Sequence, residues 1–358
     1  MENEKLHAIF QETLIYLKEP ILFEQLNDDK LVINHVITKK LRSTCNNNPD
    51  TAIKAMELLA KNIQHLDIYK TGILCKTLSD CIDITSPNNF VASFTIGMVL
   101  RNLILVDRYL LKALNYIENY DIWRNTPEEI KAWKCLDFLA EPASIVLSTN
   151  ISARKKFREN KNYFSLLARL KPFTKSIDEL FNIYKLADEK ELIFIYPKKG
   201  LGFRVILNGV QNNFHLFTLV QNELAQKAGN ILGITAPTNT DSVQIAKGIK
   251  KFDIDRKIPD SSLLNFYNWK AFYESDKQKN LYNPKYMLQG KMSPHNIPNL
   301  EGLKIVIIGD VLSPAQQWDT SEFRPLNQYL NSEAKVMEML DRSIVVEILR
   351  KIQSATIS

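Results

Sequence analysis

The sequence lacks the short motifs that identify most enzyme sites. Its five histidines are scattered, and no two have the H-x-x-x-H spacing of a zinc site. It contains no P-loop, no nucleophile elbow and no zinc signature. We therefore predict no metal site and no cofactor, and the sequence by itself does not name a reaction.

Cysteine is scarce as well. The four cysteines, Cys45, Cys75, Cys81 and Cys135, form no C-x-x-C pair. This pattern favours buried thiols in a reducing compartment. The first 18 residues mix charges and lack the apolar core of a signal peptide. We therefore expect a cytoplasmic protein.

Long uncharged apolar runs are also missing. The most apolar segment is 90–117, and its longest uncharged run, 90–100, has only 11 residues. A membrane-spanning helix needs about 20 apolar residues. We therefore expect this segment to be a buried core helix, with no membrane as partner.

The size and composition are those of an ordinary globular protein. The 358 residues suggest about two domains, and 45% apolar and 24% charged residues are typical values. The net charge of +6 is uneven, because acidic residues outnumber basic ones by 19 to 16 over 1–150, whereas basic residues outnumber acidic ones by 12 to 6 over 151–200. The basic excess therefore begins near the middle of the chain.

Helical periodicity dominates the first half. Expected helices cover 4–18, 22–41, 52–66, 68–84, 87–116, 130–147, 152–170 and 176–186. The start signals Pro49, Pro87 and Pro127 are 38 and 40 residues apart, near the period of HEAT or armadillo helical hairpins. A compact bundle explains the same pattern. We predict an all-helical domain over 1–187 that is either a repeat solenoid or a bundle.

Most strand signals follow residue 187. A strand, a glycine turn and a second strand at 192–207 lead into a helix at 213–226, and a buried central strand is expected at 302–309 around Ile305, Val306, Ile307 and Ile308. We also expect strands at 263–272 and 285–289, and one or two helices over 332–352. The strands and helices do not alternate, so we predict an α+β domain with a mainly antiparallel sheet over 188–358.

Two connections in this second domain combine aromatic and polar residues, at 293–298 and 309–325. Loops around a rigid sheet are common places for sites, and Asp310 is expected just after the buried strand. The candidate ligand-binding residues are Trp269, His295, Asp310, Trp318, Asp319 and Arg324. Alternatively, the two indoles fill the core and the loop folds back onto its own sheet.

A basic helix is expected at 154–175, where eight cations accompany one acid. Phosphate groups bind to such clusters, and its candidate anion-binding residues are Arg154, Lys155, Lys156, Arg158 and Lys161. A solvated helix face, or a contact with the acidic first half, explains the same charges.

These patterns lead to one leading hypothesis and two alternatives. The leading one is a protein-interaction or ligand-binding protein, of adaptor or inhibitor type, with a helical surface and a C-terminal pocket. Its partner would be another protein or a small molecule. The alternatives are a small-molecule enzyme with its site on loops 293–298 and 309–325, and nucleic-acid binding through 154–175.

Overall fold

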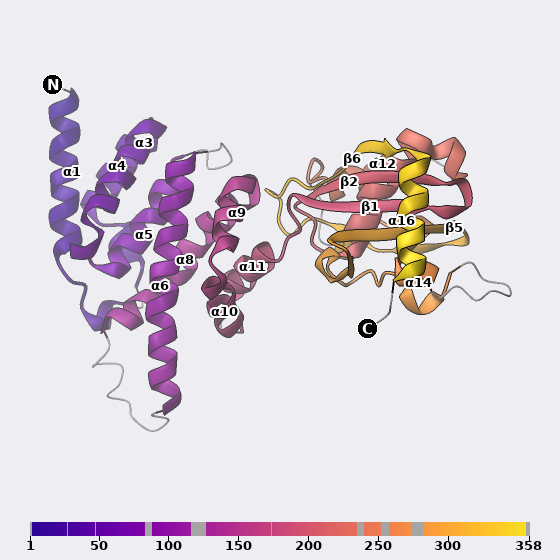
Figure 1. Ribbon diagram of the computed structural model, residues 1–358. Helices are drawn as coiled ribbons and strands as arrows, with labels where there is room; N and C mark the ends of the chain where they lie inside the picture. The colour runs from indigo at the N-terminus through magenta and orange to yellow at the C-terminus, as the bar shows by residue number, and fades with distance from the viewer. Residues whose placement is uncertain are drawn as a thin grey trace. The chain divides into compact units, whose positions relative to one another are not determined.

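The computed structural model describes residues 2–26, 28–46, 48–82, 88–115, 127–172, 174–234, 240–251, 258–273 and 282–355. The chain separates into two compact units, Met1–Tyr184 and Lys185–Ser358 (Figure 1). The described part of the first unit is helical, whereas the second combines helices with a mixed sheet. The protein is therefore of mixed α+β class.

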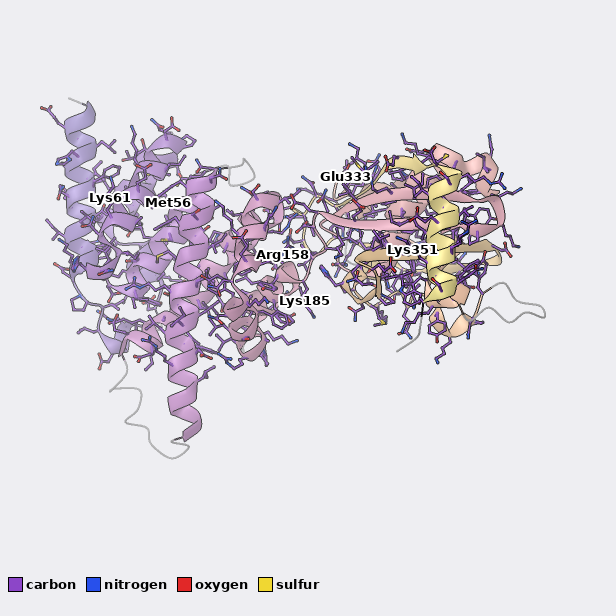
Figure 2. The ribbon with its side chains drawn as sticks, viewed as in Figure 1. Met56, Lys61, Arg158, Lys185, Glu333 and Lys351 are labelled. Carbon is purple, nitrogen blue, oxygen red and sulfur yellow. The ribbon has the colours of Figure 1, made fainter. Side chains whose placement is uncertain are left out.

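The first unit contains helices of very different lengths. They are α1 (Glu2–Lys18), α2 (Lys30–Ile33), α3 (Val36–Asn46), α4 (Pro49–Asn62), α5 (Ile68–Ser79), α6 (Asn89–Asn115), α8 (Pro127–Thr149), α9 (Ile151–Glu159), α10 (Lys161–Leu170) and α11 (Lys175–Tyr184). Helices α4, α6 and α8 begin 40 and 38 residues apart. The start signal at Pro87 lies outside the described residues. Met56 of α4 is fully buried inside this unit (Figure 2).

The single helix expected over 22–41 is wrong. The chain instead forms a 3-10 turn at Phe23–Gln25, then α2 and α3. The Gln25 side chain accepts a hydrogen bond from the Leu22 N–H (3.1 Å), and His35 Nδ1 accepts one from the Ile37 N–H (3.3 Å). Polar side chains that bind nearby backbone groups compete with helical hydrogen bonding. They therefore interrupt the helix that the apolar spacing predicts.

Helices α5, α6 and α8 form the centre of the first unit. Helix α5 is buried along nearly its whole length, and it packs closely on α8 at Gly72. A Cβ atom at Gly72 would lie 2.8 Å from Cys135 Cβ, so a glycine is needed for this approach. The thiols of Cys45, Cys75 and Cys135 are buried and free.

Helix α6 is the one described helix long and apolar enough, by length and composition, to cross a membrane. The qualifying part is 89–108, and 56% of its most apolar window is buried inside the structure. Val99, Leu103 and Val106 are almost inaccessible to solvent. The core helix of a globular unit has these same properties, as the sequence predicted.

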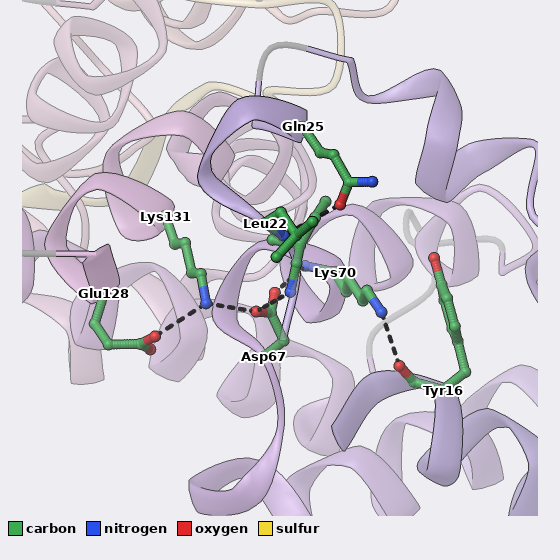
Figure 3. A network of polar contacts seen from close by, with 8 residues as sticks. Tyr16, Leu22, Gln25, Asp67, Lys70, Glu128 and Lys131 are labelled. Carbon is green, nitrogen blue, oxygen red and sulfur yellow. Dashed lines mark hydrogen bonds and ion pairs between the residues drawn. The ribbon is translucent and has the colours of Figure 1, made fainter. Parts of the chain in front are cut away.

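A buried polar network joins α1, α5 and α8 (Figure 3). The Asp67 carboxylate accepts hydrogen bonds from the backbone N–H groups of Ile21 (3.1 Å) and Lys70 (3.0 Å) and from Lys131 Nζ (2.7 Å). Lys70 Nζ donates to the Tyr16 carbonyl at 3.0 Å and lies 4.0 Å from the Tyr16 ring centroid. Buried charges are stable only when they are paired in this way.

The second unit is built on a six-stranded sheet of order β3-β5-β1-β2-β6, with β4 paired to β5. Its strands are β1 (Lys190–Tyr196), β2 (Leu201–Asn208), β3 (Asp260–Asn268), β4 (Asn299–Leu300), β5 (Leu303–Trp318) and β6 (Glu333–Leu340). Its helices are α12 (Asn213–Leu232), α13 (Thr240–Ala246), α14 (Lys270–Tyr273), α15 (Thr320–Phe323) and α16 (Arg342–Ser354). Strands β1 and β5 run parallel, and the other described pairs are antiparallel.

Both faces of the sheet are covered, as Figure 1 shows for α16 in yellow across one of them. Alternating strand residues pack against α12 on one face and against α14 and α16 on the other. Strand β5 lies between β3 and β1, and the side chains of Ile305–Ile308 are all fully buried. The predicted central strand is therefore confirmed.

The hairpin and the helix after it also form where the sequence predicted them. Gly200 ends the turn between β1 and β2 with φ of 62°, a left-handed conformation that glycine adopts readily. Helix α12 begins after Asn212, whose side chain accepts a hydrogen bond from the His215 N–H. Asn212 and Asn213 also donate to the carbonyls of Glu322 (2.9 Å) and Gln289 (2.9 Å). The start of α12 therefore holds two long connections in place.

Three predictions for this unit are wrong. Residues 285–289 contain a 3-10 turn and a single bridge rather than a strand. Residues 309–318 continue β5, because Asp260–Ser262 of β3 pair with Gln316–Trp318. Residues 333–340 form β6 instead of a helix, since Ala334 and Val336 alternate with exposed residues and pair with β2.

Candidate functional site

The helical unit contains a pocket of about 270 Å³ between α6, α9 and α10. It is lined by Asn89, Ala92, Ser93, Ile96, Gly97, Leu100, Ser152, Ala153, Lys156, Phe157 and Tyr163. This volume is close to the lower end of the range for small-molecule sites. The pocket is therefore a candidate binding site.

One face of α6 forms the longest wall. The six α6 residues in the lining follow the order i, i+3, i+4, i+7, i+8, i+11, as expected for a single helix face. Gly97 leaves this wall open, because an added Cβ atom would meet no other atom within 4 Å. A glycine inside a helix costs about 1 kcal/mol relative to alanine. Gly97 thus keeps space in the pocket at a cost to helix stability.

Helices α9 and α10 form the opposite wall, and their local sequence explains its shape. Asn150 caps α9 by accepting a hydrogen bond from the Ala153 N–H at 2.9 Å. Asn160 then interrupts the helix with extended backbone and caps α10 through the Asn162 N–H at 3.0 Å. The Phe157 and Tyr163 rings stack across this break with centroids 5.8 Å apart. The basic helix predicted as one element is therefore two, and the break between them shapes the pocket.

The floor and the rim of the pocket differ in chemistry. Ala92, Leu100, Ala153 and Phe157 are buried and apolar. Exposed rim residues carry an amide, two hydroxyls and an ammonium, on Asn89, Ser93, Ser152 and Lys156. Lys156 has the only charged side chain in the lining, and all the lining residues are described. The pocket suits an amphipathic molecule.

The five predicted anion-binding residues do not form one surface. Arg154 is buried, with 1% of its area exposed, and Nη1 donates to the carbonyls of Leu147 and Ser148, both at 2.7 Å. It thus binds the C-terminal carbonyls of α8, where a cation is favourable. An anion-binding role for Arg154 is therefore wrong, because its guanidinium is buried against backbone oxygens.

The other four cations have separate surroundings. Lys156 lines the pocket. Lys155 and Lys161 are exposed, and Arg158, labelled on α9 in Figure 2, is half-buried. The Arg158 carbonyl accepts a hydrogen bond from the Tyr184 hydroxyl at 3.1 Å. Anion binding by these four residues remains a prediction.

The two tryptophans predicted to line a C-terminal pocket lie on opposite faces of the sheet. Trp269 belongs to the core under α14 and α16, whereas Trp318 belongs to the core under α12. Each indole is 5% exposed. Because side chains alternate between faces along a strand, residues from the ends of β3 and β5 can face opposite ways. The prediction that both indoles line one pocket is wrong.

The remaining predicted residues of this unit have different local surroundings. Asp310 lies inside β5 rather than after it, and its carboxylate accepts a hydrogen bond from Lys198 Nζ at 2.6 Å. His295 is exposed, and its carbonyl accepts one from Lys304 Nζ at 2.7 Å. Asp319 and Arg324 are half-buried on either side of α15. Ligand binding by these individual residues remains a prediction.

The sequence contained one signal for the pocket that we did not use. The residues Ala92, Ser93 and Gly97 place small side chains on one face of an otherwise bulky helix. Such a face usually packs against a neighbouring helix, so the sequence gives no reason to expect a vacancy.

Within the described ranges, no group of three or more His, Cys, Asp or Glu residues could hold a metal ion.

Comparisons with known proteins give no further guide to the site. No family model matches the chain, and neither a curated protein nor a solved structure is significantly similar to it. The function is therefore argued from these residues alone.

Proposed function

We propose that this chain is a binding protein, and that its helical unit binds a small amphipathic molecule in the pocket between α6, α9 and α10. The observation that carries this proposal is the pocket itself, with its apolar floor and polar rim. Most small-molecule sites are apolar with a few polar groups that orient the ligand. The pocket has this composition.

A cytoplasmic adaptor or inhibitor with a protein partner is the wider role that we propose. Helical hairpin repeats of the HEAT or armadillo kind would provide an extended surface for such a partner. The regular starts of α4, α6 and α8 support this arrangement. Ligand binding at α6 and α9 would then affect a surface made of the same helices.

The two alternatives have less support. An enzyme site on loop 309–325 has less support because residues 309–318 belong to strand β5 and not to a loop. Nucleic-acid binding through 154–175 has less support because two of its cations are already engaged within the protein. Arg154 binds backbone carbonyls, and Arg169 forms a two-bond ion pair with Asp107 at 2.9 Å. Both roles remain proposals of lower rank.

The test uses octanamide, a neutral amphiphile, with binding measured by saturation-transfer NMR and calorimetry. Gly97→Phe should abolish binding, because the ring would occupy open space over the pocket floor. Ile104→Phe is the matched control, since Ile104 is an exposed α6 residue outside the lining. Gly97→Ala should bind more weakly while stabilising α6 by about 1 kcal/mol. Equal binding by the wild type and Gly97→Phe would refute this site.

A further inference from the structure

We infer that the ligand of this pocket carries a carboxylate that Lys156 binds at the rim, so that its class is a small amphipathic monocarboxylic acid. The inference depends on the proposed function, because it names the ligand of the same site. Lys156 is the only charged residue in the lining, and its neighbours on the rim are neutral. An anionic group at this position would therefore meet an ammonium and no carboxylate.

The charges around the pocket agree with this sign. Residues 89–100 of α6 contain no acid, and α9 holds four cations and one acid, Glu159, which is exposed and lies outside the lining. The nearby α6 acid, Asp107, is already paired with Arg169. The lining also includes the first turns of α6 and α9, whose helix dipoles add partial positive charge. A ligand cation would be repelled, whereas an anion would be attracted.

The apolar floor indicates the size and the apolar character of the rest of the ligand. A cavity of roughly 150 Å³ can hold one benzene molecule, so a pocket of about 270 Å³ has room for roughly ten non-hydrogen atoms by the same scale. Ala92, Leu100, Ala153 and Phe157 offer no buried polar side chain to that part of the ligand. A hydrocarbon chain or ring would therefore fill the floor, with the acid at the rim.

Octanoate is the probe that separates this inference from the proposed function. Octanoate labelled with ¹³C at its carboxyl carbon is titrated into the full chain, and octanamide serves as its neutral isostere. We expect Lys156→Met to weaken octanoate binding about fivefold, because an exposed ion pair contributes up to about 1 kcal/mol. Octanamide binding should be unchanged. Lys161→Met is the matched control, since Lys161 is exposed on α10 and outside the lining.

The pKa of bound octanoate supplies a readout that a merely structural role of Lys156 would not change. The ¹³C shift should show that the pocket lowers this pKa and that Lys156→Met raises it towards the value of the free acid, because a nearby cation favours the carboxylate. If octanamide binds and octanoate does not, or if both bind and Lys156→Met changes neither the octanoate affinity nor its pKa, the carboxylate assignment fails while the binding function stands. If neither probe binds, both fail.

Discussion

Asp67 holds three separate parts of the helical unit together, so its replacement should be costly. Its carboxylate caps α5, binds the backbone that follows α1, and pairs with Lys131 of α8 (Figure 3). Only 1% of the Asp67 side chain and 6% of the Lys131 side chain are exposed. Burial acts to lower the pKa of Lys131, but the hydrogen bonds and charges of Glu128 and, above all, of Asp67 outweigh it and raise the pKa. Lys131 is therefore a buried cation that depends on this carboxylate.

We expect Asp67→Ala to lower the free energy of unfolding by about 4 kcal/mol. Loss of a helix cap costs about 1 kcal/mol, and an unpaired backbone N–H at Ile21 costs about 1 kcal/mol more. Breaking a buried ion pair costs about 3–5 kcal/mol. Glu128 remains 3.1 Å from Lys131 Nζ and offsets part of that cost. The three costs sum to about 5–7 kcal/mol, and the remaining pairing with Glu128 brings the expected cost to about 4 kcal/mol.

The assay is urea-dependent hydrogen exchange, read in peptides from α5 and α8 so that it reports on the helical unit alone. Adding Lys131→Met to Asp67→Ala should recover about 2 kcal/mol, because the double variant has no unpaired buried charge. Asp80→Ala is the control, since Asp80 forms an exposed i,i+4 pair with Lys76 and should cost less than about 1 kcal/mol. A cost for Asp67→Ala no larger than that for Asp80→Ala would refute the reasoning.

Three further predictions concern other buried groups. Ile307→Asp should cost about 4 kcal/mol or more in urea unfolding, because it places an unpaired charge in a fully buried position; a folded, soluble variant would contradict the central-strand assignment. Arg154→Met should cost about 2–3 kcal/mol by removing the two hydrogen bonds that its guanidinium donates to the carbonyls of Leu147 and Ser148, whereas the neighbouring Lys155→Met should change stability by less than about 0.5 kcal/mol; equal thermal shifts would argue against the capping role. Burial lowers the pKa of His215 to about 4 from 6.5, so the unfolded chain binds the proton more readily, and stability present above pH 6.5 should fall by about 3 kcal/mol as the pH drops to 4. Subtracting the pH–stability curve of His215→Gln isolates this effect, and a difference that is flat over that window would disprove it.

Local sequence signals determined much of the secondary structure, because they act between near neighbours. The apolar run Ile305–Ile308 predicted a buried strand, and Gly200 predicted the turn of the hairpin. Gln25 and His35, which interrupt 22–41, are visible in the sequence too. The helix was nevertheless predicted there because of the spacing of its apolar residues. One or two helices were predicted over 332–352 from apolar spacing, although pairing with β2 makes residues 333–340 of this segment a strand.

Tertiary structure decided the surroundings of each functional candidate. Trp269 and Trp318 are aromatic residues near strand ends, and only the sheet register places them on opposite faces. Arg154 and Lys156 are neighbours in a basic run, but one is buried against α8 and the other lines a pocket. The space beside Gly97 exists because three helices leave it open. A vacancy depends on the distances between elements, and the sequence of one helix does not contain those distances.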